Sequence, residues 1–403
     1  MKALRKRRLR VLLVGTEFFR SYGGIQSINR LLVRAFCEMG RRTPMDLEVL
    51  SFTDGPEHFP SANCGDSPVR WFGASRRRTA IALEFAKRVS IVRPDLVLFT
   101  HVSLLPLAEV MPLLAPGTHI AALAHGTEVW KPLGGKVKRA MPRVDSWVTP
   151  SAFTAGKLTE VHSIPKERIN VIAHGLDPDW TAEGSAEITA NPSPVRTGMS
   201  LLSVTRLSRA DRQGKGIELV LRALPAVLER HPGVRYTVVG GGADLPAMAD
   251  LIQKLGLGAR ATLTGARQLE VLRQAYLESD VFVLPTQVEG FGVVFLEAMY
   301  SRLPVVAVQA AATPEVVEDG VTGILVPPGD SSALAAALVA LFSNENRRRA
   351  MGEAGRRRVE RMYCFEHFTQ RWELWLASQV PEALYAARQI GTFASMSAAA
   401  GAA

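Results

Sequence analysis

The sequence predicts an α/β fold with two Rossmann-like, doubly wound parallel-sheet domains that face each other across a cleft. With 403 residues, the chain is too long for one ordinary compact core. Short β-branched and aliphatic runs alternate with helical segments, which is typical of parallel strands covered by helices on both faces. A segment rich in Pro and Gly, 177–198, interrupts this alternation and has little apolar periodicity, so it reads as a linker.

The elements follow in order from the period of their apolar residues. Strands of the first half are expected at 10–16, 46–52, 95–100, 119–124, 146–150 and 168–173, with helices at 24–40 and 79–92. Strands of the second half are expected at 200–206, 235–240, 261–265, 281–285, 304–308 and 323–326, with helices at 217–230, 245–255, 270–278, 292–301 and 332–342. The predicted division is a first domain 1–180, a linker 181–198, a second domain 199–364, a helix 365–385 that packs back on the first domain, and a tail 386–403.

Composition excludes several classes of protein. Only three cysteines are present and they form no CxxC pair, which argues against a disulfide scaffold or a zinc ribbon and fits a reducing cytoplasm. No apolar run reaches the roughly 18 residues of a membrane span. The nearest, Leu104–Ala115, contains Pro106 and Pro112, and we expect a buried or interfacial helix there, with a role at a lipid surface as the alternative.

Charge is distributed unevenly along the chain. Residues 1–180 carry 26 Lys or Arg and 16 Asp or Glu, whereas residues 181–403 carry 22 of each, so the whole excess of +10 lies in the first half. Such asymmetry indicates an anionic partner for one half only: nucleic acid, a membrane surface or an acidic substrate.

The strongest motif is an E-x7-E pattern, Glu289 to Glu297, that spans a predicted strand–helix junction. Backbone N–H groups at the start of the helix would face an anion or a polarised hydroxyl, and the glycines of the motif would let a ligand approach closely. Both carboxylates would then accept hydrogen bonds from vicinal hydroxyls. The candidate ligand-contacting residues of this junction are Glu289, Gly290, Phe291, Gly292, Val293, Val294 and Glu297.

Three further motifs lie where predicted strands end. Arg206 and Lys215 place two cations at a strand–helix turn, an arrangement that suits a diphosphate. The pair Gly23-Gly24 precedes a helix, where it would form a phosphate-facing N-terminus. His125 follows a strand within His125-Gly126-Thr127-Glu128.

Together these motifs resemble the retaining GT-B glycosyltransferases of family 4, and the resemblance covers roughly residues 10–378. It implies that Glu289 binds hydroxyls of a donor sugar and that Glu297 binds the nucleotide ribose. It also implies that Arg206 and Lys215 stabilise the departing nucleoside diphosphate and that Gly23 and Gly24 lie over the donor phosphates. By the same resemblance His125 approaches the reaction centre, and the turn with Gly265 and Arg267 contacts the nucleotide base.

The sequence departs from the family pattern at several places. The loop between Arg206 and Lys215 is longer than usual and adds Arg209 and Arg212. Ala311 and Ala312 replace a Gly-Gly pair before Thr313-Pro314-Glu315, and His174 replaces an Asn before Asp177. The formal D-x-D of Asp177 and Asp179 coincides with this last match, so we do not interpret it as a metal site.

The resemblance implies sugar transfer from a UDP-, GDP- or ADP-sugar co-substrate to an acceptor hydroxyl, with retention of configuration and without a metal or other cofactor. Catalytic roles fall to His125, Arg206, Lys215 and Glu289. Another GT-B enzyme, such as a sugar-nucleotide 2-epimerase or a sugar-phosphate synthase, is the nearest alternative. A non-enzymatic nucleic-acid-binding protein is a distant one, since no known nucleic-acid-binding motif supports it.

In this family the first domain binds the acceptor, so the basic half becomes the acceptor half. We therefore expect a glycan or lipid-linked acceptor in cell-surface polysaccharide, lipopolysaccharide or glycolipid synthesis. We also expect a cytoplasmic protein that attaches peripherally to the anionic inner face of the membrane rather than to nucleic acid, with a merely soluble basic domain as the alternative. The candidate cationic groups are Lys2–Arg10, Arg76–Arg78 and Lys131–Arg143.

Overall fold

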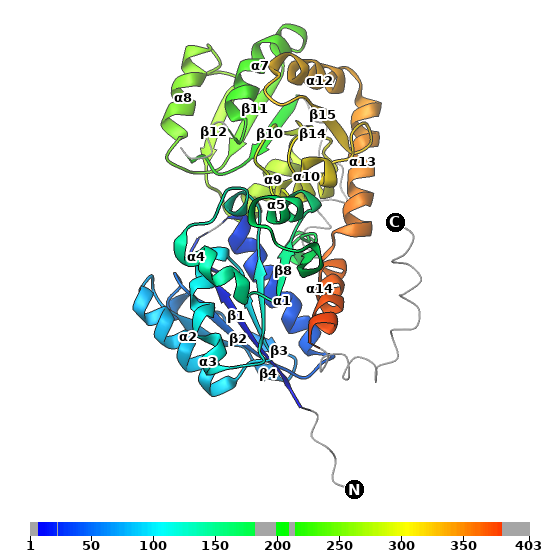
Figure 1. Ribbon diagram of the computed structural model, residues 1–403. Helices are drawn as coiled ribbons and strands as arrows, with labels where there is room; N and C mark the ends of the chain where they lie inside the picture. Colours follow the sequence, from blue (N-terminus) through cyan, green and yellow to red (C-terminus); the bar gives the residue numbers. More distant parts are fainter. Residues whose placement is uncertain (1–6, 22, 182–198, 209–213, 381–403) are drawn as a thin grey trace. The chain divides into compact units, whose positions relative to one another are not determined.

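The computed structural model describes residues 7–21, 23–181, 199–208 and 214–380 (Figure 1). The chain divides into two compact units. Unit 1 comprises residues 1–173 and the chain from Phe365 onward, and unit 2 comprises His174–Cys364. Among the described residues, no helix combines the length and the apolar character that crossing a bilayer demands.

Unit 1 contains a seven-stranded parallel sheet, one short hairpin and the helices around them. Its strands are β1 Leu9–Gly15, β2 Met45–Ser51, β3 Asn63–Cys64, β4 Ser67–Pro68, β5 Arg70–Gly73, β6 Leu96–Phe99, β7 His119–Leu123, β8 Ser146–Thr149 and β9 Ile169–Val171. Its α-helices are α1 Gly24–Gly40, α2 Arg78–Val92, α3 Met111–Leu114, α4 Gly135–Ala140, α5 Ala152–His162 and α14 Phe365–Gln379. Its 3₁₀ helices are η1 Pro56–His58, η2 Val102–Val110, η3 Thr127–Val129, η4 Met141–Arg143 and η5 Lys166–Arg168.

Unit 2 contains a six-stranded parallel sheet. Its strands are β10 Ser200–Val204, β11 Arg235–Val239, β12 Ala261–Gly265, β13 Val281–Leu284, β14 Val305–Val308 and β15 Gly323–Val326. Its helices are η6 Pro178–Trp180, α7 Ile217–Arg230, α8 Leu245–Lys254, α9 Leu269–Leu277, α10 Val293–Tyr300, α11 Thr313–Val316, α12 Ser331–Ser343 and α13 Glu345–Met362.

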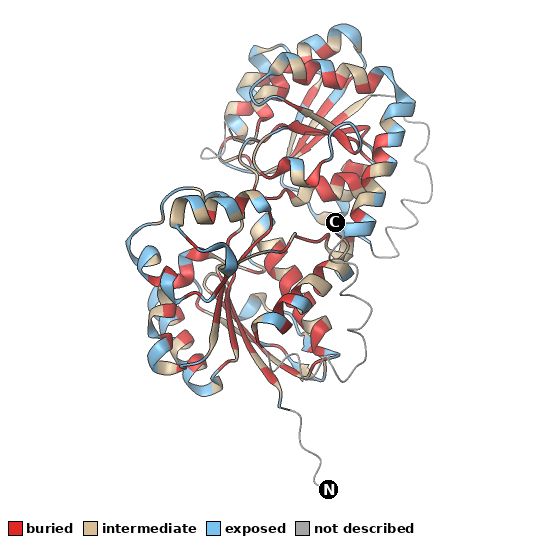
Figure 2. Ribbon diagram, turned by 45° about the vertical axis from the view of Figure 1, so that its right-hand side comes forward, coloured by how far each residue is buried: buried red, intermediate tan, exposed pale blue. Residues whose placement is uncertain are grey.

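Both large sheets have the doubly wound order of a Rossmann fold. The order is β5-β2-β1-β6-β7-β8-β9 in unit 1 and β12-β11-β10-β13-β14-β15 in unit 2, so the first strand of each unit is central and the chain then winds outward in both directions. The central strands are buried along most of their length, as the red strands of Figure 2 show, because helices cover both faces. The prediction of two parallel-sheet α/β domains is therefore confirmed.

The helices of unit 1 form two layers. Right-handed crossovers place α1, between β1 and β2, on one face of the sheet, and place α2, η2–α3, α4 and α5 on the other. One continuous hydrophobic core, with Phe85 of α2, Leu105 of η2, Met141 after α4 and Leu158 of α5, joins the second layer to the sheet. Figure 1 shows α2 and α3 side by side, with α1 and α14 on the other side of the strands.

The C-terminal helix α14 belongs to the first layer. The Trp372 ring lies 6.2 Å from that of Phe36 on α1, and Arg42 forms an ion pair with Glu373. The chain divides at His174 rather than at residue 180, because residues 174–180 pack on unit 2. Leu176 donates its N–H to the Tyr363 carbonyl, and the Trp180 ring lies 5.3 Å from Tyr276.

The segment Leu104–Ala115, expected as one helix, is instead the 3₁₀ helix η2 followed by the single turn α3. Pro106 lies inside η2 and Pro112 at the start of α3; neither ring nitrogen can donate a helical hydrogen bond. The segment is also two-faced, because Leu105 is fully buried whereas Leu113 is 86% exposed.

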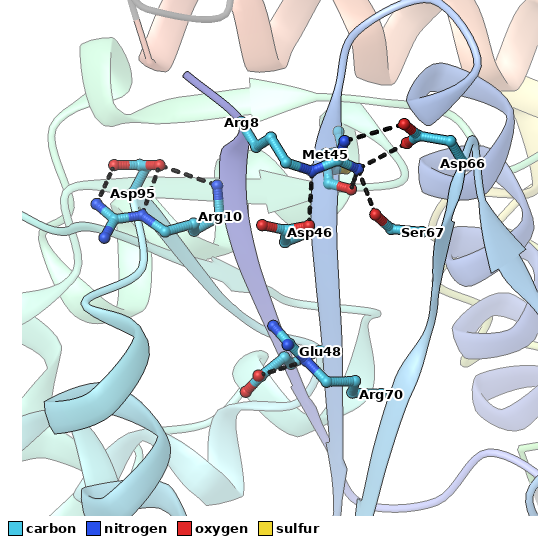
Figure 3. Close-up of polar contacts among 9 residues, drawn as sticks. All are labelled: Arg8, Arg10, Met45, Asp46, Glu48, Asp66, Ser67, Arg70 and Asp95. Carbon is cyan, nitrogen blue, oxygen red and sulfur yellow. Dashed lines mark hydrogen bonds and ion pairs between the residues drawn. The ribbon is translucent and has the colours of Figure 1, made fainter. Parts of the chain in front are cut away.

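The arginines at the start of β1 are engaged in ion pairs at the amino-terminal edge of the sheet (Figure 3). Arg8 contacts Asp46 and Asp66, and Arg10 contacts Asp95 at 3.0 Å. Asp95 also forms an ion pair with Arg7. The same view shows the buried Glu48 carboxylate beside Arg70 of β5. The described part of the cationic group Lys2–Arg10 thus has carboxylates of its own unit as partners.

Candidate active site

The candidate site of unit 2 lies where its strand order reverses. The central strands β10 and β13 are neighbours whose following connections lead to opposite sides, which is where ligands of such sheets bind. Lys215 lies in the connection after β10, and Glu289 in the connection after β13. Residues 74 positions apart in the chain are thereby brought to one edge of the sheet.

The Lys215 ammonium and the Glu289 carboxylate meet directly, with Nζ 3.0 Å from Oε2. Both side chains are partly buried, at 21% and 17% exposure. The two loops are joined by backbone as well, because Gln287 donates its N–H to the Gly214 carbonyl at 2.8 Å. Gly216 follows with φ +75°, and a Cβ there would collide with the Pro285 carbonyl, so only glycine fits this approach. The structure brings two of the predicted site residues into contact.

The helix α10 begins directly after this contact. Its N-cap is Gly292, whose φ of +89° is left-handed, and a Cβ there would collide with the Phe295 ring. The side chain of Phe291 is buried, with its ring 5.2 Å from that of His174 and 5.8 Å from that of Tyr363. Phe291 was expected to contact a ligand. Its side chain is instead used for packing, so only its backbone can face a ligand.

Glu297 lies within α10, with Oε2 accepting a hydrogen bond from the Tyr276 hydroxyl at 2.8 Å. Burial raises the pKa of this carboxyl to about 7; the Tyr276 hydrogen bond lowers it, and the nearby Asp177 charge raises it. Glu297 therefore titrates close to neutral pH. Sequence reasoning missed Tyr276, which lies on the predicted helix 270–278 and belongs to no recognised motif.

The other unit 2 residues that the family resemblance assigns to donor binding lie at neighbouring strand ends. Arg206 is exposed just beyond β10, and its backbone neighbourhood is fixed because Leu207 donates to the Gly241 carbonyl at 2.9 Å. Gly265 ends β12 with φ +72°, and Arg267 two residues later is exposed. Arg209 and Arg212 lie outside the described residues.

Of the Ala-Ala pair that replaces Gly-Gly, Ala311 has a backbone conformation typical of glycine and Ala312 does not. Ala311 has φ +49°, in the left-handed region that L-residues rarely adopt. The next residue, Ala312, donates its N–H to the Glu289 carbonyl at 3.2 Å. This turn therefore supports the backbone of Glu289 without glycine.

In unit 1, His125 lies at the carboxyl end of β7. This strand is next to β6, and the strand order of the sheet reverses between β1 and β6. Its Nε2 lies 2.8 Å from the Thr100 carbonyl oxygen, which can only accept, so Nε2 carries the proton and Nδ1 holds the lone pair. Burial lowers the pKa of His125, which favours this neutral form. His101 at the end of β6 has its ring 6.4 Å away, and burial lowers its pKa too. Sequence reasoning missed His101, although it also follows a predicted strand.

The loop after β1 is held by a buried carboxylate that sequence reasoning also missed. Asp54 is fully buried and accepts hydrogen bonds from three successive backbone N–H groups, those of Phe18, Phe19 and Arg20, at 2.7 to 3.1 Å. The Ser51 hydroxyl donates a fourth, at 2.6 Å. Such a nest of amides neutralises a carboxylate without a cation, and here it fixes the conformation of the loop that leads to Gly23.

Neither glycine of the Gly23-Gly24 pair is demanded by the backbone. Gly23 has an extended φ of 176°, and a Cβ on Gly24 would meet no atom within 4 Å. A requirement for glycine here would therefore come from a ligand rather than from the protein's own turn.

In the D-x-D segment the Asp177 carboxylate caps a turn. Asp177 caps η6 and accepts the N–H of Asp179 at 2.9 Å. Within the described ranges, no three His, Cys, Asp or Glu side chains gather in a way that could hold a metal ion.

Both halves of the chain match models of known protein families. Residues 198–358 match the family model Glycosyl transferases group 1, and residues 22–180 match Glycosyltransferase Family 4. These ranges nearly coincide with the two sheets and their helices.

Individual proteins give the same result. The chain is 30% identical over 271 residues to a GDP-mannose-dependent alpha-(1-6)-phosphatidylinositol monomannoside mannosyltransferase of Mycolicibacterium smegmatis, covering 62% of this chain and 68% of the relative. It is 26% identical over 382 residues to the sulfoquinovosyl transferase SQD2 of Arabidopsis thaliana, covering 89% and 72%. Its structure resembles that of Anabaena HepE in complex with UDP and glucose, with a TM-score of 0.71 and 19% identity over 92% of this chain and 100% of the other.

The structural likeness confirms the GT-B fold, and the sequence matches confirm the expected family. The chain belongs to the family 4 (group 1) glycosyltransferases.

Proposed function

We propose that this glycosyltransferase moves a sugar from a nucleotide-sugar donor to an acceptor hydroxyl with retention of configuration and without a metal ion. The observation that carries the proposal is the contact between Lys215 and Glu289, at the reversal of strand order in unit 2. It sets a cation and a carboxylate side by side, as a ligand with both phosphates and hydroxyls requires.

Lys215 and Arg206 would carry the phosphate charge. As the bond from the sugar to the diphosphate breaks, negative charge grows on the leaving phosphate, and fixed cations stabilise that charge most in the transition state. The hydrogen bond from Gln287 to Gly214 holds the Lys215 loop in place before the donor arrives. Two cations and the amides at the start of α10 would supply this stabilisation without a divalent ion.

Glu289 and Glu297 would bind the sugar and the ribose. Glu289 would accept from hydroxyls of the donor sugar while its partner Lys215 holds the carboxylate in position. Glu297 would accept from the ribose, with the Tyr276 hydroxyl fixing one of its two oxygens. The backbone amides of Gly290 to Val294, and the turn with Gly265 and Arg267, would complete the donor contacts.

His125 would act from unit 1, close to the transferred sugar. Because its Nε2 proton is engaged by the Thr100 carbonyl, the ring is held in one orientation and one tautomer, with the lone pair on Nδ1. The open space above Gly24 suits a substrate phosphate or acceptor group near the start of α1. The new bond would form on the face from which the diphosphate leaves, which retains configuration.

The comparisons support a nucleotide-sugar donor and a lipid-linked acceptor. HepE was solved with UDP and glucose, and the M. smegmatis relative is named for GDP-mannose and a phosphatidylinositol mannoside. We extend this to a UDP-, GDP- or ADP-sugar and a glycan or lipid-linked acceptor. The pathway would be synthesis of a cell-surface polysaccharide, lipopolysaccharide or glycolipid, at the cytoplasmic face of the membrane.

The test is a product-release screen with UDP-, GDP- and ADP-sugars, followed by lipid-linked acceptors. A transferase releases the nucleoside diphosphate from one donor class, and the Glu289→Gln and Lys215→Ala variants should each lower that release by about 10²-fold or more. Adding EDTA should leave the rate unchanged if no metal takes part. Donor epimerisation without diphosphate release would instead identify a sugar-nucleotide 2-epimerase, and transfer to a sugar phosphate would identify a sugar-phosphate synthase.

A further inference from the structure

The helical layer of unit 1 that lies opposite α1 and α14 exposes large apolar side chains. We define the α2–α4 face as residues 76–93, 102–117 and 131–143, which include α2, η2–α3, α4 and η4. Among the described residues, the three most exposed large apolar side chains lie here: Leu113 at 86%, Leu83 at 73% and Ile91 at 65%. Such residues are unremarkable when scattered singly but indicate an interaction surface when they gather on one face.

Helix geometry places these side chains outward. On α2, Ile81, Phe85 and Val89 are buried against the sheet, so Leu83 and Ile91, eight residues apart, share the outer side. Leu113 projects from the short turn α3, which packs beside α2, as Figure 1 shows. The apolar side chains therefore come from two adjacent elements of one layer.

The same face carries most of the charge excess of the protein. Its three segments contain eleven Lys or Arg and two Glu. Both carboxylates are already paired with arginines of the face, Glu84 with Arg88 and Glu109 with Arg139. The other nine cations are exposed side chains: Arg76, Arg77, Arg78, Lys87, Arg93, Lys131, Lys136, Lys138 and Arg143. Helix α5 of the same layer adds no net charge from Lys157 and Glu160, which form an ion pair with each other.

The opposite layer gives the contrast. Helices α1 and α14 together contain three arginines and three glutamates and so carry no net charge from these residues. The arginines at the start of β1 pair with Asp46, Asp66 and Asp95. The charge asymmetry of the sequence is thus an asymmetry between the two faces of one sheet.

We propose that the α2–α4 face binds the surface of an anionic lipid bilayer, with Leu83, Ile91 and Leu113 entering the interface among lipid headgroups. Exposed apolar side chains and cations on the same face complement such a surface, since the cations meet the headgroups and the apolar side chains reach the acyl boundary. A bilayer also accounts for the three side chains that are 65% exposed or more, because its acyl boundary takes up apolar groups. The inference extends the proposed lipid-linked acceptor, yet binding can be measured without donor or acceptor.

The test is co-sedimentation of the full-length protein with vesicles of phosphatidylcholine alone, or mixed with phosphatidylglycerol, at physiological salt. The wild-type protein should partition preferentially onto the anionic vesicles. The triple variant Leu83→Ser, Ile91→Ser, Leu113→Ser should lower that partitioning by about tenfold or more. The variant Arg76→Gln, Arg77→Gln, Arg78→Gln should lower it by about fivefold for each cation that lies near the surface.

Matched controls come from unit 2. Val271 and Val321 are exposed apolar residues, at 52% and 44%, and Val271→Ser, Val321→Ser should leave partitioning unchanged. Three exposed cations of α13, changed as Arg347→Gln, Arg357→Gln, Arg361→Gln, test whether positive charge anywhere suffices. Equal wild-type partitioning onto both vesicle types would overturn the inference, and so would control variants that lose as much as the face variants. Donor hydrolysis, measured without vesicles, should remain as in the wild type in the apolar face variant, which separates this inference from the proposed reaction.

Discussion

Units 1 and 2 share a strand order, yet they hold their candidate residues by different means. In unit 2 charged and polar side chains hold one another, as in Lys215 with Glu289 and Tyr276 with Glu297. In unit 1 backbone groups hold the side chains: three amides bind Asp54, and the Thr100 carbonyl binds His125. Substituting Lys215 or Glu289 in unit 2 should therefore act mainly on ligand chemistry, whereas substituting Asp54 in unit 1 should act on the loop itself.

The largest effect should follow removal of the cations of unit 2. Lys215→Ala and Arg206→Ala should each lower turnover by about 10²-fold or more, because in the proposed mechanism each removes charge stabilisation of the leaving diphosphate. Steady-state release of nucleoside diphosphate measures this effect. Arg222→Ala, a surface arginine of α7 that pairs with Glu218, is the matched control and should retain full activity. Wild-type kinetics in both site variants would remove the role assigned to them.

Unit 1 should respond through stability. Asp54→Ala leaves three backbone N–H groups without their acceptor, and each group is costly to bury unpaired, so the free energy of unfolding should fall by about 2 kcal/mol or more. Denaturant titration measures the loss. Asp330→Ala removes an exposed carboxylate that caps α12 through the Ala333 amide and should cost about 1 kcal/mol. If Asp54→Ala lowered the free energy of unfolding no more than this control does, the three amides around Asp54 would not be what holds the loop.

The Glu297 carboxyl predicts a pH dependence near neutrality. Its pKa is about 7 in the folded protein against 4.5 as its ordinary value, so the folded state binds the proton more tightly. The free energy of unfolding should therefore decrease as pH rises from about 4.5 to about 7 and then level off. Glu297→Gln should remove this component, which denaturant titrations between pH 5 and pH 8 would show.

The same titration should appear in donor binding. In the proposed donor site the ionised Glu297 accepts hydrogen bonds from the ribose more strongly than the neutral acid does, so the donor KM should fall by several-fold as pH rises through about 7. Tyr276→Phe removes a hydroxyl that stabilises the charged carboxylate and should move this transition to higher pH. A donor KM that does not change with pH in the wild type or in the Tyr276→Phe variant would argue against ribose binding by Glu297.

The features of the fold and site that could be predicted from the sequence are those encoded by residues close together in the chain. Apolar periodicity located both sheets, and the E-x7-E spacing located the start of α10 and its carboxylates. Asp54 and Tyr276 escaped prediction because their partners lie 34 to 36 and 21 residues away, at distances along the chain that only the fold brings together. Arg8 and Arg10 seemed available to a membrane for the same reason, since Asp46 and Asp95 reach them only across the sheet.

The smallest effect tests the backbone of unit 2, where a turn rather than a charge supports Glu289. Ala311 has φ +49°, which costs an L-residue about 1 to 2 kcal/mol, whereas glycine adopts it freely. Glycine also gains more entropy on unfolding, so Ala311→Gly should raise the free energy of unfolding by under about 1 kcal/mol. Its neighbour Ala310 has no positive φ, and Ala310→Gly should instead lower stability. If both variants lost stability equally in thermal melts, the left-handed turn would carry no strain, and the alanines would be as well suited to it as the glycines that they replace.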